Sequence, residues 1–187
     1  DALTHAIEGY TTKGANEITD MFNLKAIEKI ASSLRDAVEN KPEGREGMAL
    51  GQYIAGMGFS NVGLGVDHAM AHTLSAHYDT PHGVACAMLL PIAMEFNKPV
   101  VADRLADVAR AMGVDTAGMS AEEAADAAID AVRALSSDVE IPKTCKGLVE
   151  GDLEQLATDA MADACFPGNP RDATHEEVVE LFRKIMA

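Results

Sequence analysis

Apolar residues that recur every three or four positions dominate this sequence, and their spacing constrains the fold more than any other feature. Between residues 16 and 40 they form one stripe of a predicted helix, which consists of Ile18, Met21, Phe22, Leu24, Ile27, Ile30, Leu34 and Val38. Comparable patterns predict further helices over residues 1–10, 46–60, 66–78, 84–96, 99–112, 120–135 and 152–164. Capping boxes at Ser120–Glu123 and Thr174–Glu177 mark two helix starts. No β-hairpin signal lies between these segments, so we expect one all-α domain over residues 1–187.

Composition agrees with a helical core. The chain has 187 residues, of which 48% are hydrophobic but only 4% are aromatic, and it contains no Trp. The core must therefore consist of Ala, Leu, Met, Ile and Val, which favours closely packed helices over a β-sandwich. The longest apolar stretch, Val84–Met94, contains Pro91, where we expect a kink. It is shorter than the roughly 18 residues that a membrane-spanning helix needs.

Charge and cysteine content limit the partners and the compartment. The formal net charge is −15, from 30 acidic and 15 basic residues, which argues against nucleic acid and anionic membranes as partners. Three cysteines, Cys86, Cys145 and Cys165, show no CxxC spacing. Reduced thiols and the lack of a signal-peptide pattern predict a cytoplasmic protein.

Glycines are concentrated in the predicted helix over residues 46–60, at Gly47, Gly51, Gly56 and Gly58. Each glycine inside a helix costs on the order of 1 kcal/mol relative to alanine. Two explanations remain open and do not exclude one another. Either another helix backbone approaches closely here, or the glycines leave room for a ligand.

Histidines and an aspartate occur at spacings that suit a divalent metal ion. Asp1 and His5 are four residues apart, as are His68 and His72, so each pair shares one face of a helix. His82 follows beside a proline and a glycine. One carboxylate with several imidazoles suits Fe²⁺ or Zn²⁺ and can leave coordination positions open for a substrate. Spacing alone does not select the ligands among these side chains.

Three neighbouring residues have less specific roles. His77 lies off the face shared by His68 and His72, so we expect His77 to be a polar residue at the rim of the metal site and not a ligand. Asp67 either supports a histidine nitrogen or faces solvent. Cys86 follows His82 by four residues, and we expect it to be a buried packing thiol.

Four separated segments resemble the iron-containing (group III) alcohol dehydrogenases: DALTHAIEGYTTKGAN, MALGQYIAGMGFSNVGLG, HAMAHTLSAHYDTPHGVA and PGNPRDAT. The resemblance covers essentially all of residues 1–187. It implies the C-terminal helical metal-binding domain of a dehydroquinate-synthase-like fold. Members of this family begin with an α/β nucleotide-binding domain that carries a G-G-G-S turn, and this chain has no such turn. Gly63-Leu64-Gly65 does not replace it, because no strand precedes it.

The resemblance also implies roles for individual residues. Asp1, His5, His68 and His82 match the metal ligands of the family. His72 matches a position near the nicotinamide and the substrate, where a polar contact or a proton relay is inferred. Cys165 matches part of the substrate-pocket wall. The departures, at Thr73, His77 and Val66-Asp67, lie beside the pocket and bear on substrate preference more than on metal binding.

The implied activity is the interconversion of short-chain alcohols or diols with aldehydes, with NAD as the hydride carrier. Fe²⁺, or Zn²⁺ as the alternative, would act as a Lewis acid on the substrate oxygen. We expect the missing NAD-binding domain to be a necessary partner, this chain to be inactive without it, and the intact enzyme to be a homo-oligomer. Another hypothesis is a stand-alone helical metal-binding or interaction module without turnover. A metal-dependent hydrolase is less favoured, because no HExxH motif is present.

Overall fold

The computed structural model describes residues 1–187 and contains helices but no strands, which confirms the predicted all-α class. The elements are α1 (Ala2–Thr11), α2 (Glu17–Val38), α3 (Pro42–Phe59), α4 (Val66–Tyr78), α5 (His82–Ala111), α6 (Ala121–Asp138), η1 (Glu150–Asp152), α7 (Leu153–Ala162), η2 (Phe166–Gly168) and α8 (His175–Arg183).

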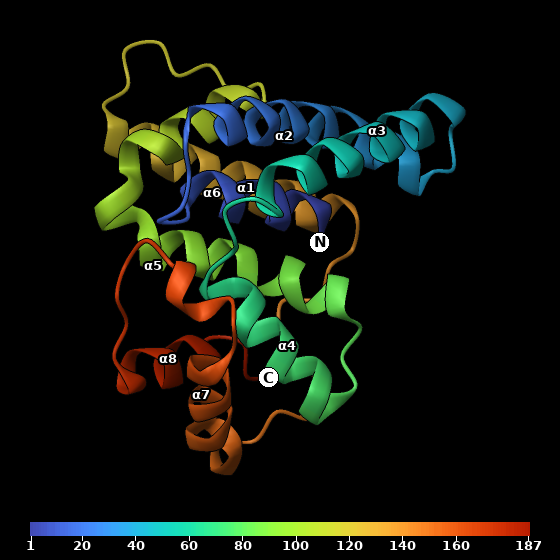
Figure 1. The fold of residues 1–187 in the computed structure, drawn as a ribbon. Coiled ribbons are helices and arrows are strands. Elements are labelled where there is room, and N and C mark those ends of the chain that lie inside the picture. The colour runs from blue at the N-terminus through green and yellow to red at the C-terminus, as the bar shows by residue number, and fades with distance from the viewer.

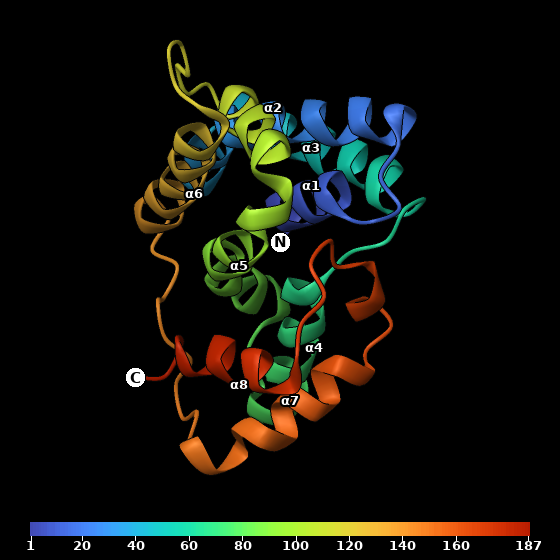
Figure 2. The same ribbon diagram turned by 90° about the vertical axis from the view of Figure 1, so that its left-hand side faces the viewer.

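Helix α5 runs through the middle of the molecule and separates two groups of helices (Figures 1 and 2). On one side lie α1, α2, α3 and α6, and on the other lie α4, α7 and α8. Each group has its own apolar core, and α5 contributes to both. Leu89 belongs to the core shared with α4, α7 and α8, whereas Leu90 belongs to the core shared with α1, α2, α3 and α6.

Local signals in the sequence define several helix starts. Ser120 and Glu123 form the predicted capping box of α6, and Thr174 forms another with Glu177 at α8. The side chain of Asn16 caps α2 in the same way. These boxes satisfy backbone N–H groups that would otherwise lack partners in the first turn.

Helix α5 corrects two expectations. It begins at His82 rather than at Val84, and the two predicted helices, over residues 84–96 and 99–112, form one element that continues to Ala111 and is divided by a kink. The break lies at Val101, where φ is −134° and ψ is 23°, and not at Pro91. Pro99 lies just before it, and a proline ring clashes with the carbonyl four residues earlier. By length and hydropathy α5 could cross a membrane, but 56% of its most apolar window is buried within the molecule.

Helices α2 and α3 pack against each other through glycine. Helix α3 begins at Pro42, four residues before the predicted start at residue 46, and proline suits a first helical position. A Cβ atom on Gly44 would lie 2.3 Å from the backbone nitrogen of Ala37, and one on Gly58 would lie 2.0 Å from Oδ1 of Asn23. Close helix approach therefore explains both glycines. Gly56 has nothing within 4 Å of its Cβ position and shows no such requirement.

Candidate metal centre

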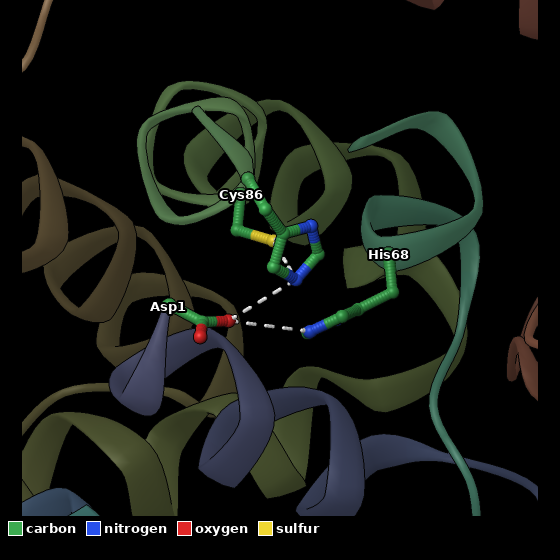
Figure 3. A group of neighbouring side chains, drawn as sticks. Asp1, His68 and Cys86 are labelled. Atoms are coloured by element: carbon green, nitrogen blue, oxygen red, sulfur yellow. Dashed lines mark hydrogen bonds and ion pairs between the residues drawn. The ribbon is translucent and has the colours of Figure 1, made fainter. Parts of the chain in front are cut away.

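Three helix starts meet where the two groups of helices join. Asp1 is the N-cap of α1, His68 lies in the first turn of α4, and His82 is the first residue of α5. Figure 3 shows the side chains of Asp1, His68 and Cys86 directed toward one another. Helices far apart in the sequence thus bring polar side chains to a single point between two apolar cores.

One carboxylate oxygen lies at the middle of this group. Oδ1 of Asp1 is 3.2 Å from Nδ1 of His5, and 3.6 Å from Nε2 of both His68 and His82. The structure therefore brings together all four side chains that match the family's metal ligands. The side chains of Asp1 and His82 are 40% and 36% exposed, so the centre is open to small molecules on their side.

Glu8 is the residue that sequence reasoning missed. Its carboxylate is buried, accepts hydrogen bonds from the backbone N–H groups of Asp67 (2.8 Å) and His68 (3.3 Å), and contacts Nδ1 of His68 at 2.7 Å. With a proton on Nδ1 directed at Glu8, the lone pair of Nε2 is free to bind a cation. Glu8 lies one helical turn after His5, on a face of α1 near that of His5, which is the signal that would have identified it.

A buried nitrogen without a partner indicates what this centre can hold. The His68 side chain is only 1% exposed, and its Nε2 makes no hydrogen bond. A buried polar atom without a partner is costly, and such an atom deserves an explanation. A divalent cation among Nε2, the Asp1 carboxylate and the neighbouring imidazoles would satisfy it. The side chains therefore fit Fe²⁺ or Zn²⁺, both of which accept imidazole and carboxylate ligands.

Electrostatics at the three buried or half-buried histidines differ. Burial and the neighbouring His68 lower the pKa of His5 to about 3, and burial together with His68 and His72 lowers the pKa of His82. These two imidazoles are therefore held in the neutral form that binds metals. At His68 burial also acts to lower the pKa, but the Cys86 thiol and the Glu8 carboxylate outweigh it and raise the pKa to about 10. Binding of a metal ion at Nε2 therefore requires loss of the second imidazole proton, because a doubly protonated ring has no free lone pair.

Asp67 takes neither of its two expected roles. Its side chain is fully buried, and neither carboxylate oxygen has a hydrogen-bond partner, so it does not support a histidine nitrogen and does not face solvent. Burial and the nearby Glu8 carboxylate hold the pKa of Asp67 well above its usual range. The expectation failed because Asp67 lies in the first turn of α4, which is enclosed by α1 and the segment around Asn169.

A second polar group adjoins the centre. Nδ1 of His72 lies 2.9 Å from Oδ2 of Asp163, and Oδ1 of Asp163 accepts a hydrogen bond from the backbone N–H of Cys165 at 2.8 Å. The ring of His72 stacks on that of His82, with 5.2 Å between the ring centroids. His72 and Cys165 therefore lie together beside the metal centre. Asp163 was missed, because only the tertiary structure places it next to His72.

The structure also places His77 and Cys86. His77 points away from the centre, is 40% exposed and contacts Asp159, with 2.8 Å between Nε2 and Oδ2. Cys86 is buried, as expected. Its Sγ atom lies 3.6 Å from Nε2 of His82, which places a thiol within the centre itself.

Comparison with known proteins connects this geometry to one family. Residues 1–186 match the sequence profile of the "Fe-containing alcohol dehydrogenase family, C-terminal". The chain is 54% identical over 184 residues to lactaldehyde reductase of Escherichia coli strain K12, a match that covers 97% of this chain and 48% of that protein. It is 43% identical over 188 residues to 1,3-propanediol dehydrogenase of Citrobacter freundii, covering 98% and 49% of the two chains.

Solved structures show the same likeness. A crystal structure of 1,3-propanediol oxidoreductase matches with a TM-score of 0.97 and 42% identity, over 100% of this chain and 50% of that one. An alcohol dehydrogenase from Oenococcus oeni matches with a TM-score of 0.96 and 42% identity, over 99% and 49%. The chain thus spans about half the length of the curated relatives and solved structures that it matches.

Proposed function

Because this chain belongs to the Fe-containing alcohol dehydrogenase family and corresponds to its C-terminal helical domain, we propose that it supplies the metal centre of an NAD-linked oxidoreductase. The enzyme interconverts short-chain alcohols or diols with aldehydes, of the lactaldehyde and 1,2-propanediol type. Two relatives support this substrate class, since they are named for lactaldehyde and for 1,3-propanediol. The chain matches about half of each, so an N-terminal domain would supply the NAD site.

The buried Nε2 of His68, which has no partner, is the observation that carries the proposal. It faces Asp1 and shares that carboxylate with His5 and His82. These four residues would hold Fe²⁺, or Zn²⁺ as the alternative. When bound, the ion supplies Lewis-acid polarisation of the substrate oxygen.

The other residues position and protect this chemistry. Glu8 fixes the ring orientation of His68 and directs Nε2 toward the centre. Asp163 engages Nδ1 of His72, which leaves Nε2 of His72 as the nitrogen that can exchange a proton. We assign this proton exchange to His72, close to the substrate and the nicotinamide. Cys165 forms part of the pocket wall beside it.

The setting of the enzyme completes the proposal. We place it in the cytoplasm, because all three cysteines are free and two of them are buried. We also propose that residues 1–187 fold as one domain, since α5 contributes to both cores. The intact enzyme is, in this proposal, a homo-oligomer.

Substitution of His82 tests the function. In the full-length enzyme His82→Ala should lose bound metal and NAD-dependent lactaldehyde reduction together, because an imidazole ligand is removed from the open side of the centre. His77→Ala is the matched control, since His77 is similarly exposed but points at Asp159. Metal content by elemental analysis and turnover are measured side by side. Stoichiometric metal and normal turnover in His82→Ala would refute the ligand assignment, and metal binding without any turnover in the wild type would favour a non-catalytic module.

A further inference from the structure

The thiol of Cys86 is a donor that the family's ligand set does not include. Cys86 is fully buried, and its Sγ lies 3.6 Å from Nε2 of His82. Asp1, His68, His82 and Cys86 each offer one ligand atom, and these four atoms all lie within 4.8 Å of one another. Figure 3 shows the sulfur close to the Asp1 carboxylate and the His68 ring.

The separations match the edges of a coordination polyhedron. Zn–S distances of about 2.3 Å and Zn–N distances of about 2.0 Å place sulfur and nitrogen about 3–3.5 Å apart for bond angles of roughly 90–110°. The observed separation between Cys86 Sγ and His82 Nε2 is 3.6 Å. The distances from Asp1 Oδ1 to Nε2 of His68 and of His82 are also 3.6 Å. Cys86 lies one helical turn after His82 in α5, but its Sγ also lies within 4.8 Å of the ligand atoms of Asp1 and His68, which come from other helices.

We propose that Cys86 is a ligand of the metal ion, through its thiolate, beside Asp1, His5, His68 and His82, and that it raises the affinity of this centre for Zn²⁺ relative to Fe²⁺. The inference rests on the proposed metal centre and deepens it by addressing the choice of metal. Thiolate is a softer donor than imidazole or carboxylate and favours zinc. On binding, the S–H proton leaves to solvent, sulfur replaces a water molecule on the ion, and no oxidation state changes.

Cobalt spectroscopy tests whether sulfur binds the metal. The protein is freed of metal, loaded with Co²⁺, and examined for the near-ultraviolet charge-transfer band that a thiolate–Co²⁺ bond produces. We expect the band in the wild type and its loss in Cys86→Ser. Cys145→Ser is the matched control, because Cys145 is also buried but belongs to neither group of potential ligand atoms. Cys165→Ser is the second control, because Cys165 lies with His72 and Asp163.

The outcomes separate this inference from the proposed function. Bound Co²⁺ without a thiolate band, or a band that disappears only in Cys165→Ser, overturns the role of Cys86 but leaves the metal centre intact. Failure of the wild type to bind Co²⁺ at all overturns both. If circular dichroism shows that Cys86→Ser does not fold, Cys86→Ala takes its place in the same measurement.

Competition between metals tests the second half of the inference. The wild type and Cys86→Ser are equilibrated anaerobically with equal concentrations of Zn²⁺ and Fe²⁺, and the bound metals are then quantified. We expect the preference for zinc to fall about tenfold or more in the variant, since even residues that only support a ligand change metal affinity by that much. An unchanged ratio would contradict the assignment.

Discussion

At the scale of single residues, the centre depends on carboxylates that hold histidines in place. Glu8 contacts Nδ1 of His68 at 2.7 Å, and Asp163 contacts Nδ1 of His72 at 2.9 Å. In both pairs the carboxylate leaves Nε2 as the nitrogen that is free for chemistry. The two pairs differ in burial, because Glu8 and His68 are buried whereas the side chain of His72 is 44% exposed. The buried pair suits a fixed ligand, and the exposed pair suits proton exchange.

Glu8→Gln tests the supporting role of Glu8. Each carboxylate oxygen of Glu8 accepts a hydrogen bond from one backbone N–H group, of Asp67 or of His68. In Gln an NH₂ group replaces one of these oxygens and cannot accept, so one hydrogen bond is lost and His68 is no longer held in one orientation. We expect metal affinity to fall about 10- to 100-fold. Competition with a chromophoric chelator measures it, and Glu17→Gln, at an exposed position of α2, is the control. Unchanged affinity would mean that Glu8 does not position His68.

Cys165 should be an unreactive thiol at neutral pH. Partial burial and the neighbouring Asp163 carboxylate raise its pKa to about 11. Because the thiolate is the nucleophile, the alkylation rate should rise about tenfold per pH unit from pH 7 and level off only near pH 11. Iodoacetamide labelling followed by peptide mass spectrometry gives the rate at Cys165 itself. A rate that levels off near pH 8.5 would show that Asp163 does not act on this thiol.

At the scale of elements, the packing of α3 on α2 depends on which residues lack a side chain. Gly58 faces Asn23, whose side chain is fully buried and has no hydrogen-bond partner, whereas Gly56 faces open space. Both glycines lie in the last turns of the same helix. The distance from each glycine of α3 to the neighbouring helix therefore determines where a side chain is tolerated.

Alanine substitution at these two glycines should give opposite results. The new Cβ in Gly58→Ala would lie 2.0 Å from Oδ1 of Asn23, so either the buried side chain or the helix must move. We expect a loss of about 1–3 kcal/mol in the free energy of unfolding. Gly56→Ala should instead be stabilising, by up to about 1 kcal/mol, because alanine is the better helix former. Denaturant unfolding measures both, and equal effects would argue against the close approach.

At the scale of the whole molecule, the metal centre lies between two apolar cores. Its residues come from α1, which packs with α2, α3 and α6, from α4, which packs with α7 and α8, and from α5, which joins the two groups. A bound ion would therefore link the two groups at a point where polar side chains interrupt their packing. Metal binding and the stability of the fold should be coupled.

Thermal unfolding with and without metal measures this coupling. Zn²⁺ at about 100 times its dissociation constant should add about 2.7 kcal/mol to the free energy of unfolding, which corresponds to a rise of roughly 5–10 °C in Tm. His82→Ala should unfold at a temperature that does not respond to Zn²⁺, and His77→Ala should respond like the wild type. A wild-type Tm that is insensitive to both Zn²⁺ and Fe²⁺ would contradict a centre that joins the two groups.

The sequence by itself determined the all-α fold and the side chains of the candidate centre. Periodic apolar positions and capping boxes such as Ser120–Glu123 act over a few residues, so the helices can be predicted from local spacing. The choice of Asp1, His5, His68 and His82 came from motifs that resemble one family, and all four side chains lie together in the structure. The same local rules predicted a kink at Pro91, whereas the helix breaks at Val101, so the position of this boundary was wrong.

Only the tertiary structure decided which atoms meet at the centre. Glu8 and His68 are 60 residues apart, and His72 and Asp163 are 91 residues apart, so no local spacing relates them. The burial of Asp67 and the position of Cys86 beside Asp1 and His68 likewise depend on how α1, α4 and α5 pack. The physical reason is that a donor becomes a ligand through distance and desolvation, and packing between distant helices sets both.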